Sequence, residues 1–423
     1  MANQVDTTVF EMLESNVRSY CRSAPVVFSS GHGAVLHTED GRRILDFFSG
    51  AGALNYGHND EAMTEALVSY IQSGGVMHGL DLYTVMKRDL LHAIQNSLLT
   101  PRNLDYKVQF CGPTGADANE AAIKLARKVT GRHRVVAFNG GYHGMTAGAL
   151  AVSGAKRLRT FGSPGANAET TFVPYETSMY GPFDSIAYLD RLVEEAGSGF
   201  ELPAAVIVEA VQIQAGVFSA SNQWLRGLRE WTDRHNVVLI CDEVQSGCGR
   251  TGDFFAFERA GIVPDIVTTA KSISGSGLPM ALALLKRDLD VWEPGEHTGT
   301  FRGNQLAFVT AKVALDYWQN DKFNQHLIEN AGAIDGFGQR VTEFDGGVSA
   351  RWSGMLAALD FGLGNVETAT RAQALALDAG VLVERCGPNG EVVKLMPPIN
   401  TPTDILVEGL EAIFGTLSAA VNT

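Results

Sequence analysis

The chain has 423 residues, of which 45% are hydrophobic and 19% are charged, so its composition is that of an ordinary globular protein and excludes general disorder. At about 100–200 residues per domain, this length predicts two or three structural units. A formal net charge of −14 argues against nucleic acid or an anionic membrane surface as the main partner.

The N-terminus and the cysteines indicate the compartment. Residues 1–14 carry acidic side chains where a secretory signal has basic ones, and no later apolar run is long enough to span a bilayer. The five cysteines are odd in number and form no CxxC pair, which fits neither a disulfide framework nor a metal site. We therefore expect a cytoplasmic protein without a bound metal and with most of its cysteines buried.

The elements are predicted in chain order from hydrophobic periodicity and turn residues. A helix at about 8–20 is followed by a hairpin-like segment at 26–48. The expected strands are 107–111, 134–138, 204–209, 237–242, 265–270 and 280–285, and the clearest helices between them are 118–129 and 223–235. Near-continuous apolar runs suit strands that are covered by helices on both faces. This order predicts an α/β domain around a mostly parallel sheet, in which ligands bind beyond the carboxyl ends of the strands.

The two ends of the chain have a different pattern. Helices are expected at 306–319 and 323–344, followed by short mixed elements to the end of the chain. We expect residues 1–56 and 311–423 to form one smaller α+β domain beside a large domain at 57–310. No internal repeat or low-complexity linker separates these parts.

Three segments at predicted strand ends carry chemistry. Residues 111–120, CGPTGADANE, join a strand to a helix N-terminus, where free N–H groups and the helix dipole favour a phosphate. Asp242 ends one apolar strand, and Lys271 ends another before a glycine-rich loop. A partly desolvated lysine has a lowered pKa and is suited to forming a Schiff base.

Each segment has a structural alternative when taken singly. Most strand–glycine–helix turns bind nothing, Asp242 could cap a helix or form an ion pair, and Lys271 could extend to solvent. Together they supply a phosphate anchor, an acid for a pyridinium nitrogen and a lysine for an aldehyde, which are the three groups that pyridoxal 5′-phosphate (PLP) requires.

The motifs resemble, over nearly the whole chain, the class III aminotransferases of PLP fold type I. Residues 138–144, FNGGYHG, are similar to a motif whose aromatic residue, here Tyr142, stacks on the cofactor ring. Residues 242–252, DEVQSGCGRTG, are similar to a motif in which Asp242 pairs with the ring nitrogen, Val244 packs on the ring and Gln245 reaches the phenolic oxygen. The resemblance implies Lys271 as the Schiff-base lysine and catalytic proton carrier.

The same resemblance implies the remaining cofactor contacts and the oligomeric state. Gly115 and Ala116 match the positions whose backbone amides hold the phosphate. Residues 297–304, HTGTFRGN, match the segment that passes a threonine, here Thr300, to the phosphate of the neighbouring subunit. A homodimer, or a dimer of dimers, with shared active sites is therefore expected.

Within the family, three stretches resemble the members that make L-2,4-diaminobutyrate from L-aspartate 4-semialdehyde and L-glutamate. These stretches are 17–28, 76–84 and 299–304. The implied reaction is the first step of ectoine synthesis, although siderophore-pathway members share the chemistry. Open alternatives are other ω-amino acid aminotransferases, acting on 4-aminobutyrate or ornithine, then a PLP mutase and a non-catalytic PLP-fold protein.

The positions that would bind substrate depart from relatives that act on ornithine or 4-aminobutyrate. Met145 and Lys394 stand where those relatives commonly have arginine, and Gln214 stands where they have a glutamate that pairs with the second arginine. Lysine offers a point charge instead of a bidentate fork. We expect no gating by an arginine–glutamate pair and name Arg302 as the candidate for glutamate's distal carboxylate, with a dimer-interface salt bridge as its alternative.

Other candidate residues have both a functional and a structural interpretation. Glu209 either contacts substrate or supports the cofactor pocket from behind. His143 and Tyr83 are candidates for lining the pocket, with buried packing the favoured interpretation of each. Arg250 is expected to be structural.

Overall fold

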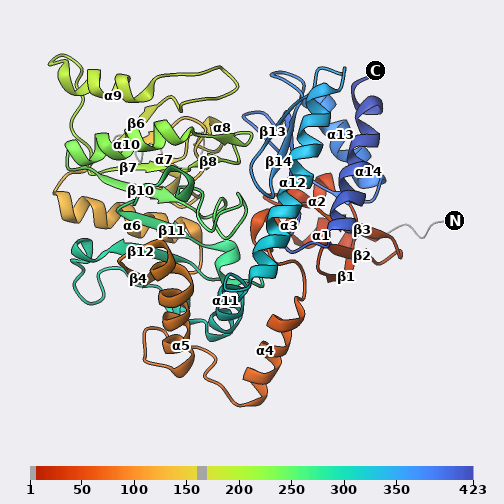
Figure 1. Cartoon of the computed structure of the whole chain (residues 1–423), viewed down its shortest axis with the longest axis horizontal. Coiled ribbons are helices and arrows are strands. Elements are labelled where there is room, and N and C mark those ends of the chain that lie inside the picture. The colour runs from red at the N-terminus through yellow and green to blue at the C-terminus, as the bar shows by residue number, and fades with distance from the viewer. Residues whose placement is uncertain (1–5, 160–168, 423) are drawn as a thin grey trace.

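The structure is a computed structural model, and it describes residues 6–159 and 169–422. Figure 1 shows two lobes: a larger one built from the middle of the chain around a central sheet, and a smaller one in which the N-terminal elements lie beside the C-terminal ones. Residues 1–5 of the predicted N-terminal segment lie outside the described part.

The larger lobe contains a seven-stranded sheet. Its strands are, in spatial order, β4 (Tyr106–Phe110), β12 (Leu282–Lys286), β11 (Ile266–Thr269), β10 (Val238–Asp242), β7 (Ala205–Val208), β5 (Val135–Phe138) and β6 (Thr170–Val173). Strand β12 runs antiparallel to both neighbours, and the other pairings are parallel. The predicted mostly parallel sheet is confirmed, and all six expected strands are present within two residues. Strand β6, which the sequence reasoning missed, lies at the sheet edge and begins with two polar threonines.

Helices and short segments surround this sheet. The helices are α4 (Glu61–Gln72), α5 (Val85–Ala93), α6 (Gly115–Thr130), α7 (Ala147–Val152), α8 (Lys156–Arg159), α9 (Ser185–Glu194), α10 (Asn222–Arg234) and α11 (Gln305–Tyr317). The short elements are η1 (Ile94–Leu99), η2 (Thr100–Arg102), η3 (Glu258–Ala260), η4 (Lys271–Ser274), η5 (Arg287–Leu289), η6 (Thr300–Gly303) and the two-stranded β8 (Val211–Gln212) with β9 (Phe218–Ser219). Predicted helices 118–129, 223–235 and 306–319 correspond to α6, α10 and α11.

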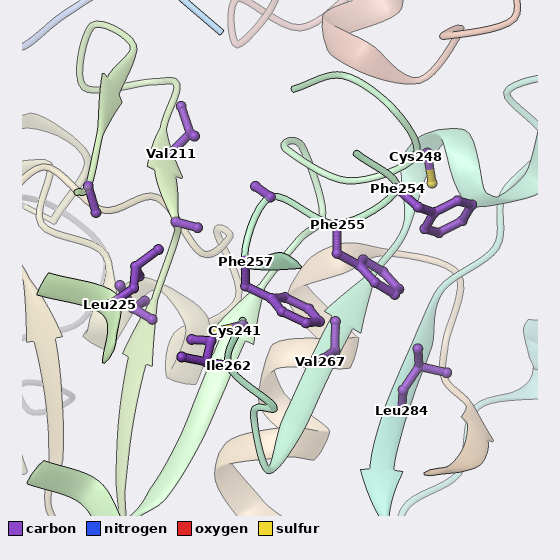
Figure 2. Packing of buried hydrophobic residues seen from close by; sticks show 14 of the residues in the cluster. Val211, Leu225, Cys241, Cys248, Phe254, Phe255, Phe257, Ile262, Val267 and Leu284 are labelled. Carbon is purple, nitrogen blue, oxygen red and sulfur yellow. The ribbon is translucent and has the colours of Figure 1, made fainter. Parts of the chain in front are cut away.

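Both faces of the large sheet are buried. Alternate side chains of a strand point to opposite faces, so neighbouring residues belong to different core clusters. Cys241 of β10 and Val267 of β11 belong to one core cluster, whereas Ile240 and Ile266 belong to another. Figure 2 shows Cys241, Val267 and Leu284 on the first face, with Phe255 and Phe257 packed nearby. Such packing fixes the strand ends, and therefore the side chains that follow them.

The smaller lobe combines both ends of the chain. One sheet contains β1 (Phe28–His32), β2 (Val35–Thr38), β3 (Arg43–Asp46) and β15 (Val381–Leu382), and the other contains β13 (Ser349–Trp352), β14 (Ala357–Asp360), β17 (Val392–Leu395) and β16 (Glu384–Cys386). Helices α12 (Asp321–Glu343), α13 (Val366–Asp378) and α14 (Thr403–Val421) cover them. Strand β15 pairs parallel with β3, so both chain ends contribute to one sheet. The exact domain limits stay a prediction.

The prediction for the first helix is wrong. Instead of one helix at 8–20, two short helices form, α1 (Thr8–Leu13) and α2 (Tyr20–Ser23), and α3 (Ser49–Gly52) follows β3. Helix α1 buries none of its residues, and the backbone is already extended at Glu14. Without a buried face, helix propensity alone does not carry the helix through the polar residues that follow.

Two searches of the described residues concern membranes and metals. Within residues 6–159 and 169–422, no helix is long and apolar enough to cross a membrane. The same part of the chain holds no group of three or more His, Cys, Asp or Glu residues placed to bind a metal ion. Four of the five cysteines are buried and Cys21 is exposed.

Candidate active site

The carboxyl ends of β4, β10 and β11 lie at one edge of the large sheet. Through the intervening strand β12, Phe110 is level with Thr269. Asp242 pairs directly with Thr268. The loop after β4, the carboxylate of Asp242 and Lys271 therefore lie at the same edge of the sheet, as expected for groups that follow the carboxyl ends of its strands.

Asp242 is 3% exposed and accepts three hydrogen bonds. Asn119 Nδ2 and His143 Nδ1 lie 2.8 and 2.7 Å from Oδ2, and the N–H of Val244 lies 3.0 Å from Oδ1. Thr268 donates to Asn119 Oδ1, which orients the amide so that its NH₂ faces Asp242. Hydrogen-bond donors of this kind stabilise a buried carboxylate in its charged form.

His143 is a buried hydrogen-bond partner of Asp242. Burial lowers the pKa of His143, but its hydrogen bond to Asp242 and the negative charges of Asp242 and Glu209 outweigh burial, so the pKa is raised overall. The imidazole therefore gains a proton more readily than usual and balances part of the negative charge at the end of β10. The result is a fixed, partly compensated anion facing the edge of the sheet.

Lys271 has the properties of a reactive amine. Burial first, and then the nearby charge of Lys394, lower the pKa of Lys271 to about 8, although Asp242, Glu384 and Glu209 oppose the shift. An amine with this pKa is unprotonated in a substantial fraction of molecules near neutral pH. Its backbone has a φ of 52°, an uncommon value for lysine that marks a sharp turn out of β11.

The start of α6 forms a site suited to a phosphate. Thr114 caps the helix by accepting a hydrogen bond from the N–H of Asp117. Among the described residues, no hydrogen bond engages the N–H groups of Gly115 and Ala116 at the first turn. A Cβ atom at Gly115 would lie 2.6 Å from Val244 Cγ1, so only glycine fits between this turn and the loop after β10. Free amides at a helix N-terminus bind anions.

These features accommodate pyridoxal 5′-phosphate. The free amides of Gly115 and Ala116 suit its phosphate, the buried carboxyl group of Asp242 suits its ring nitrogen, and the amine of Lys271 suits its aldehyde. All three groups lie at one edge of one sheet.

Comparison with known proteins identifies the family. The family model described as aminotransferase class-III matches residues 18–417. The chain belongs to the class-III aminotransferases. Enzymes of this family use pyridoxal 5′-phosphate, so this protein is a PLP-dependent aminotransferase.

Several relatives are similar over nearly their full length. An uncharacterized aminotransferase, y4qG, from Sinorhizobium fredii is 46% identical over 97% of this chain and 92% of its own length. Proteins named diaminobutyrate–2-oxoglutarate transaminase from Halalkalibacterium halodurans and Streptomyces anulatus are 46% and 47% identical, over 100% and 96% of this chain and 98% and 96% of their own.

Solved structures show the same fold. A transaminase from the marine bacterium Virgibacillus superimposes with a TM-score of 0.86 at 20% identity, covering 98% of each chain. The ornithine aminotransferase of Toxoplasma gondii gives 0.83 at 23% identity, over 97% of this chain and 93% of its own. At these identities the likeness concerns the fold alone, and it confirms the predicted fold type I.

The expected ring-contacting residues surround the same edge. The N–H of Tyr142 donates to Glu209 Oε2 at 3.0 Å, which links the aromatic residue to the strand end of β7. Val244 packs against Gly115, and Gln245 Nε2 donates to the carbonyl of Ala51 at 3.0 Å. The Gln245 amide is therefore held by the polypeptide and points toward the N-terminal segment.

Glu209 is an acid buried behind this aminotransferase site. Its side chain is 6% exposed, and burial raises its pKa to about 7, with His143 opposing and Asp242 reinforcing the shift. Its described hydrogen bond is to the backbone of Tyr142. This placement favours support of the cofactor pocket over direct substrate contact.

Three predicted residues lie apart from this cluster in the single chain. Arg302 forms an ion pair with Asp81, and Thr300 is exposed at the start of η6. Tyr83 is fully exposed, so its expected burial is not found within one subunit. Within residues 6–159 and 169–422, no hydrogen bond or ion pair joins these three side chains to Lys271 or Asp242.

Lys394 lies in an environment that the sequence reasoning missed. The side chain is fully buried, its Nζ donates a hydrogen bond to Gln214 Oε1, and it lies 3.0 Å from Glu384 Oε2. No arginine–glutamate pair forms at these positions, but an ion pair does, with Glu384 as the acid. The sequence carries no local signal of this pair, because the contact arises from the register of two antiparallel strands in which residues 384 and 394 are directly paired.

Arg250 is also fully buried. Its guanidinium donates to the carbonyls of Met355 and Pro397 and to Asn55 Oδ1. Burial lowers its pKa to about 9. These contacts connect the loop after β10 with the smaller lobe, which is the structural role that the sequence suggested.

Proposed function

We propose that this aminotransferase transfers the amino group of L-glutamate to L-aspartate 4-semialdehyde, giving L-2,4-diaminobutyrate and 2-oxoglutarate. The observation that supports the substrate pair is the full-length similarity, at 46–47% identity, to proteins named diaminobutyrate–2-oxoglutarate transaminase. The assembly of Lys271, Asp242 and the start of α6 at one sheet edge supports the chemistry.

The proposed roles of the residues follow from their contacts. Bound PLP supplies an electron sink for the substrate carbon that loses a proton. The amine of Lys271 would hold the cofactor through its aldehyde, and the free amine would take the proton from that substrate carbon and return it. Asp242, held by Asn119 and His143, would pair with the ring nitrogen and favour its protonated form. Gly115 and Ala116 bind the phosphate through their N–H groups.

Tyr142, Val244 and Gln245 complete the proposed cofactor contacts: Tyr142 and Val244 would pack on the ring, and Gln245 would reach its phenolic oxygen. Glu209 supports Tyr142 from behind. Lys394 and Gln214, which share a hydrogen bond, are proposed to bind a substrate carboxylate. These assignments rest on the family motifs and on the placement of each residue around the same edge.

A second copy of the chain is proposed to complete the site. Exposed apolar side chains gather in the connection between α4 and α5 and next to it: Val76, Met77, Leu80, Leu82, Tyr83, Val85 and Phe301. Phe301 contacts His78 of this connection, and Figure 1 shows the connection projecting from one side of the molecule. A patch of this kind marks an association surface. Its burial would explain the exposure of Tyr83 and would bring Thr300 to the phosphate of the neighbouring subunit.

The assembly is tested by light scattering of wild-type protein and of Tyr83→Asp. Dimer or tetramer mass for the wild type and monomer mass for the variant are expected, together with a lower affinity of the variant for PLP. A monomeric wild-type protein with full activity would contradict the proposal. The same measurement separates dimer from tetramer.

The reaction is tested by single turnover. Glutamate added to the holoprotein should convert the bound cofactor to its aminated form and release one equivalent of 2-oxoglutarate; aspartate 4-semialdehyde should then restore the original spectrum. A mutase would isomerise its substrate without a separate donor, and a non-catalytic protein would show no spectral change. Comparing the reaction rates of 4-aminobutyrate, ornithine and diaminobutyrate then identifies the amine that the enzyme prefers.

The metabolic pathway that uses the product is a separate proposal. The first step of ectoine synthesis is our preferred assignment, and growth of a producing strain at high salt after deletion of the gene is the test. Loss of a siderophore instead of ectoine would assign the other pathway. The expected cytoplasmic location stays a prediction.

A further inference from the structure

The segment α3, which follows β3, is a single left-handed turn. Its four residues, Ser49, Gly50, Ala51 and Gly52, have φ values of 48°, 56°, 58° and 86°. Glycine adopts this conformation freely, but Ser49 and Ala51 are strained in it, because Cβ comes close to the following carbonyl oxygen. Strain of this kind persists only where the surrounding structure holds it, and it is concentrated at functional sites.

Hydrogen bonds at its start hold this turn in place. The N–H groups of Phe48 and Ser49 donate to Asp46 Oδ1 at 2.9 and 2.8 Å, and the Ser49 hydroxyl donates to the carbonyl of Met396 at 2.6 Å. The carbonyls of Phe48 and Ser49 accept hydrogen bonds from N–H groups three and five residues further on. The turn is therefore anchored on β3 and on the residue just after β17.

The last two carbonyls of the turn contact two segments of the active site. The Ala51 oxygen accepts a hydrogen bond from Gln245 Nε2 at 3.0 Å, and the Gly52 oxygen accepts one from Ser272 Oγ at 2.8 Å. A carbonyl oxygen can only accept, so the contact with Ala51 determines which end of the Gln245 amide faces the turn. The second hydrogen of that NH₂ group is then available to another oxygen.

Ser272 connects the turn with Lys271, the residue before it. The buried Ser272 hydroxyl donates to the carbonyl of Gly52 and accepts a hydrogen bond from the N–H of Asn55 at 2.9 Å. Asn55 is itself held by the guanidinium of Arg250. Lys271 has a φ of 52°, so one hydroxyl group joins two segments whose backbones are both strained.

We propose that the left-handed turn at 49–52 is a positioning element of the active site and that Ser272 is the positioning residue that joins it to Lys271. The last two carbonyls of the turn set the direction of the Gln245 amide and of the backbone that carries the Lys271 amine. Because successive carbonyls belong to one rigid turn, the two groups are fixed relative to each other. The inference rests on the roles proposed above for Lys271 and Gln245.

The strain is tested in the apoprotein by the same substitution at two positions. Ala51→Gly should leave Tm unchanged or raise it, because relief of strain offsets the greater freedom of glycine in the unfolded chain. Ala53 has a φ of −83°, so Ala53→Gly has only the second effect and should lower Tm by about 1–2 °C. A loss for Ala51→Gly equal to or greater than that for Ala53→Gly would overturn the strained turn.

Ser272→Ala tests the connection in the holoenzyme. The half-reaction with glutamate should slow about ten- to a hundredfold, because the Lys271 amine loses its fixed direction, while the KM for glutamate changes less than about threefold. Ser272→Thr keeps the hydroxyl and should restore the rate to within about threefold of wild type. Ser276→Ala removes a hydroxyl of the same loop that bonds Thr310 instead, and it should leave the rate unchanged.

Gly52→Ala disturbs the same contact from the other side. Alanine is strained at a φ of 86°, so both carbonyls should move and the half-reaction should slow about tenfold. Combined with Ser272→Ala, it should cost no more than the slower single variant, because both changes remove one interaction. Weaker donation by Gln245 to the phenolic oxygen should raise, by about one pH unit, the pH at which the absorbance of the bound cofactor changes.

Gly261→Ala is the matched control for backbone strain. Gly261 has a φ of 67°, and nothing lies within 4 Å of an added Cβ, so this variant should lower Tm without changing the rate or the pH of the absorbance change. Rate losses in Ser276→Ala or Gly261→Ala that match those in Ser272→Ala and Gly52→Ala would reduce the effect to stability and overturn the positioning role.

The outcomes separate this inference from the proposed function. Borohydride labelling of another lysine in the wild type would refute the role of Lys271. With the label on Lys271, unchanged rates in Ser272→Ala and Gly52→Ala, additive losses in the double variant, or a Ser272→Thr rate no higher than that of Ser272→Ala would overturn the positioning role alone. If glutamate does not react, the rates are measured with the amine donor that does, and the pH of the absorbance change requires no substrate.

Discussion

Replacing Asp242 by asparagine removes the negative charge at the end of β10 with little change of shape. The native carboxylate is 3% exposed and accepts hydrogen bonds from Asn119, His143 and the N–H of Val244. An amide has one accepting oxygen, so its NH₂ group would face one of these donors. The pKa of His143 should fall in the variant, because burial lowers it and the opposing hydrogen bond to Asp242 is weakened.

The size of the effect follows from burial. Leaving a buried cation without its partner costs about 3–5 kcal/mol, and here that cation is the protonated ring nitrogen of the cofactor. At 1.36 kcal/mol per factor of ten, the half-reaction with glutamate should slow roughly 10²- to 10⁴-fold. Stopped-flow absorbance measures this rate directly and does not depend on the second substrate.

Glu243→Gln is the matched control. Glu243 is the next residue, is 1% exposed, and accepts hydrogen bonds from Ser246 and from the N–H groups of Ala256 and Phe257. Its role is to hold the loop after β10, so the variant should lower Tm while the half-reaction rate stays within about tenfold of wild type. Equal rate losses in Asp242→Asn and Glu243→Gln at equal Tm would refute the assignment of Asp242.

Three other expectations concern the amine, the phosphate site and the distal carboxylate. Lys271→Ala should abolish turnover while PLP still binds, and borohydride should label Lys271 alone in the wild type. Because the pKa of the free Lys271 amine is lowered to about 8 and only the unprotonated amine condenses with an aldehyde, the rate at which the apoprotein joins added PLP should rise with pH up to about that value. Gly115→Val should weaken PLP binding about tenfold or more because the new side chain clashes with Val244, and adding Val244→Ala should restore part of the lost affinity. Fluorescence titration measures this affinity, and an unchanged value for Gly115→Val would mean that the phosphate binds elsewhere. Arg302→Leu should raise the KM for glutamate about ten- to a hundredfold, with little change in the KM for diaminobutyrate. If both KM values change equally, and Asp81→Asn has the same effect, Arg302 has no role beyond its ion pair with Asp81.

The sequence by itself determined the large sheet and the residues at its edge. Apolar runs located six of the seven strands because strands buried on both faces tolerate few polar side chains. Asp242 and Lys271 were noticeable because each places a charge directly after such a run. The motif around Tyr142 then related these positions to one cofactor.

Only the tertiary structure decided which charges meet. Glu384 was not predicted because an acid in a short strand has no periodic signature, and its contact with Lys394 arises from the antiparallel register of β16 and β17. The helix predicted at 8–20 was broken because local propensity does not reveal whether a face will be buried. Tyr83 was expected to be buried and is fully exposed in the single chain, because an aromatic side chain in a connecting segment carries no local signal of what packs against it. Short-range pattern locates the strands, whereas contacts between distant residues depend on strand register and on how the two ends of the chain come together.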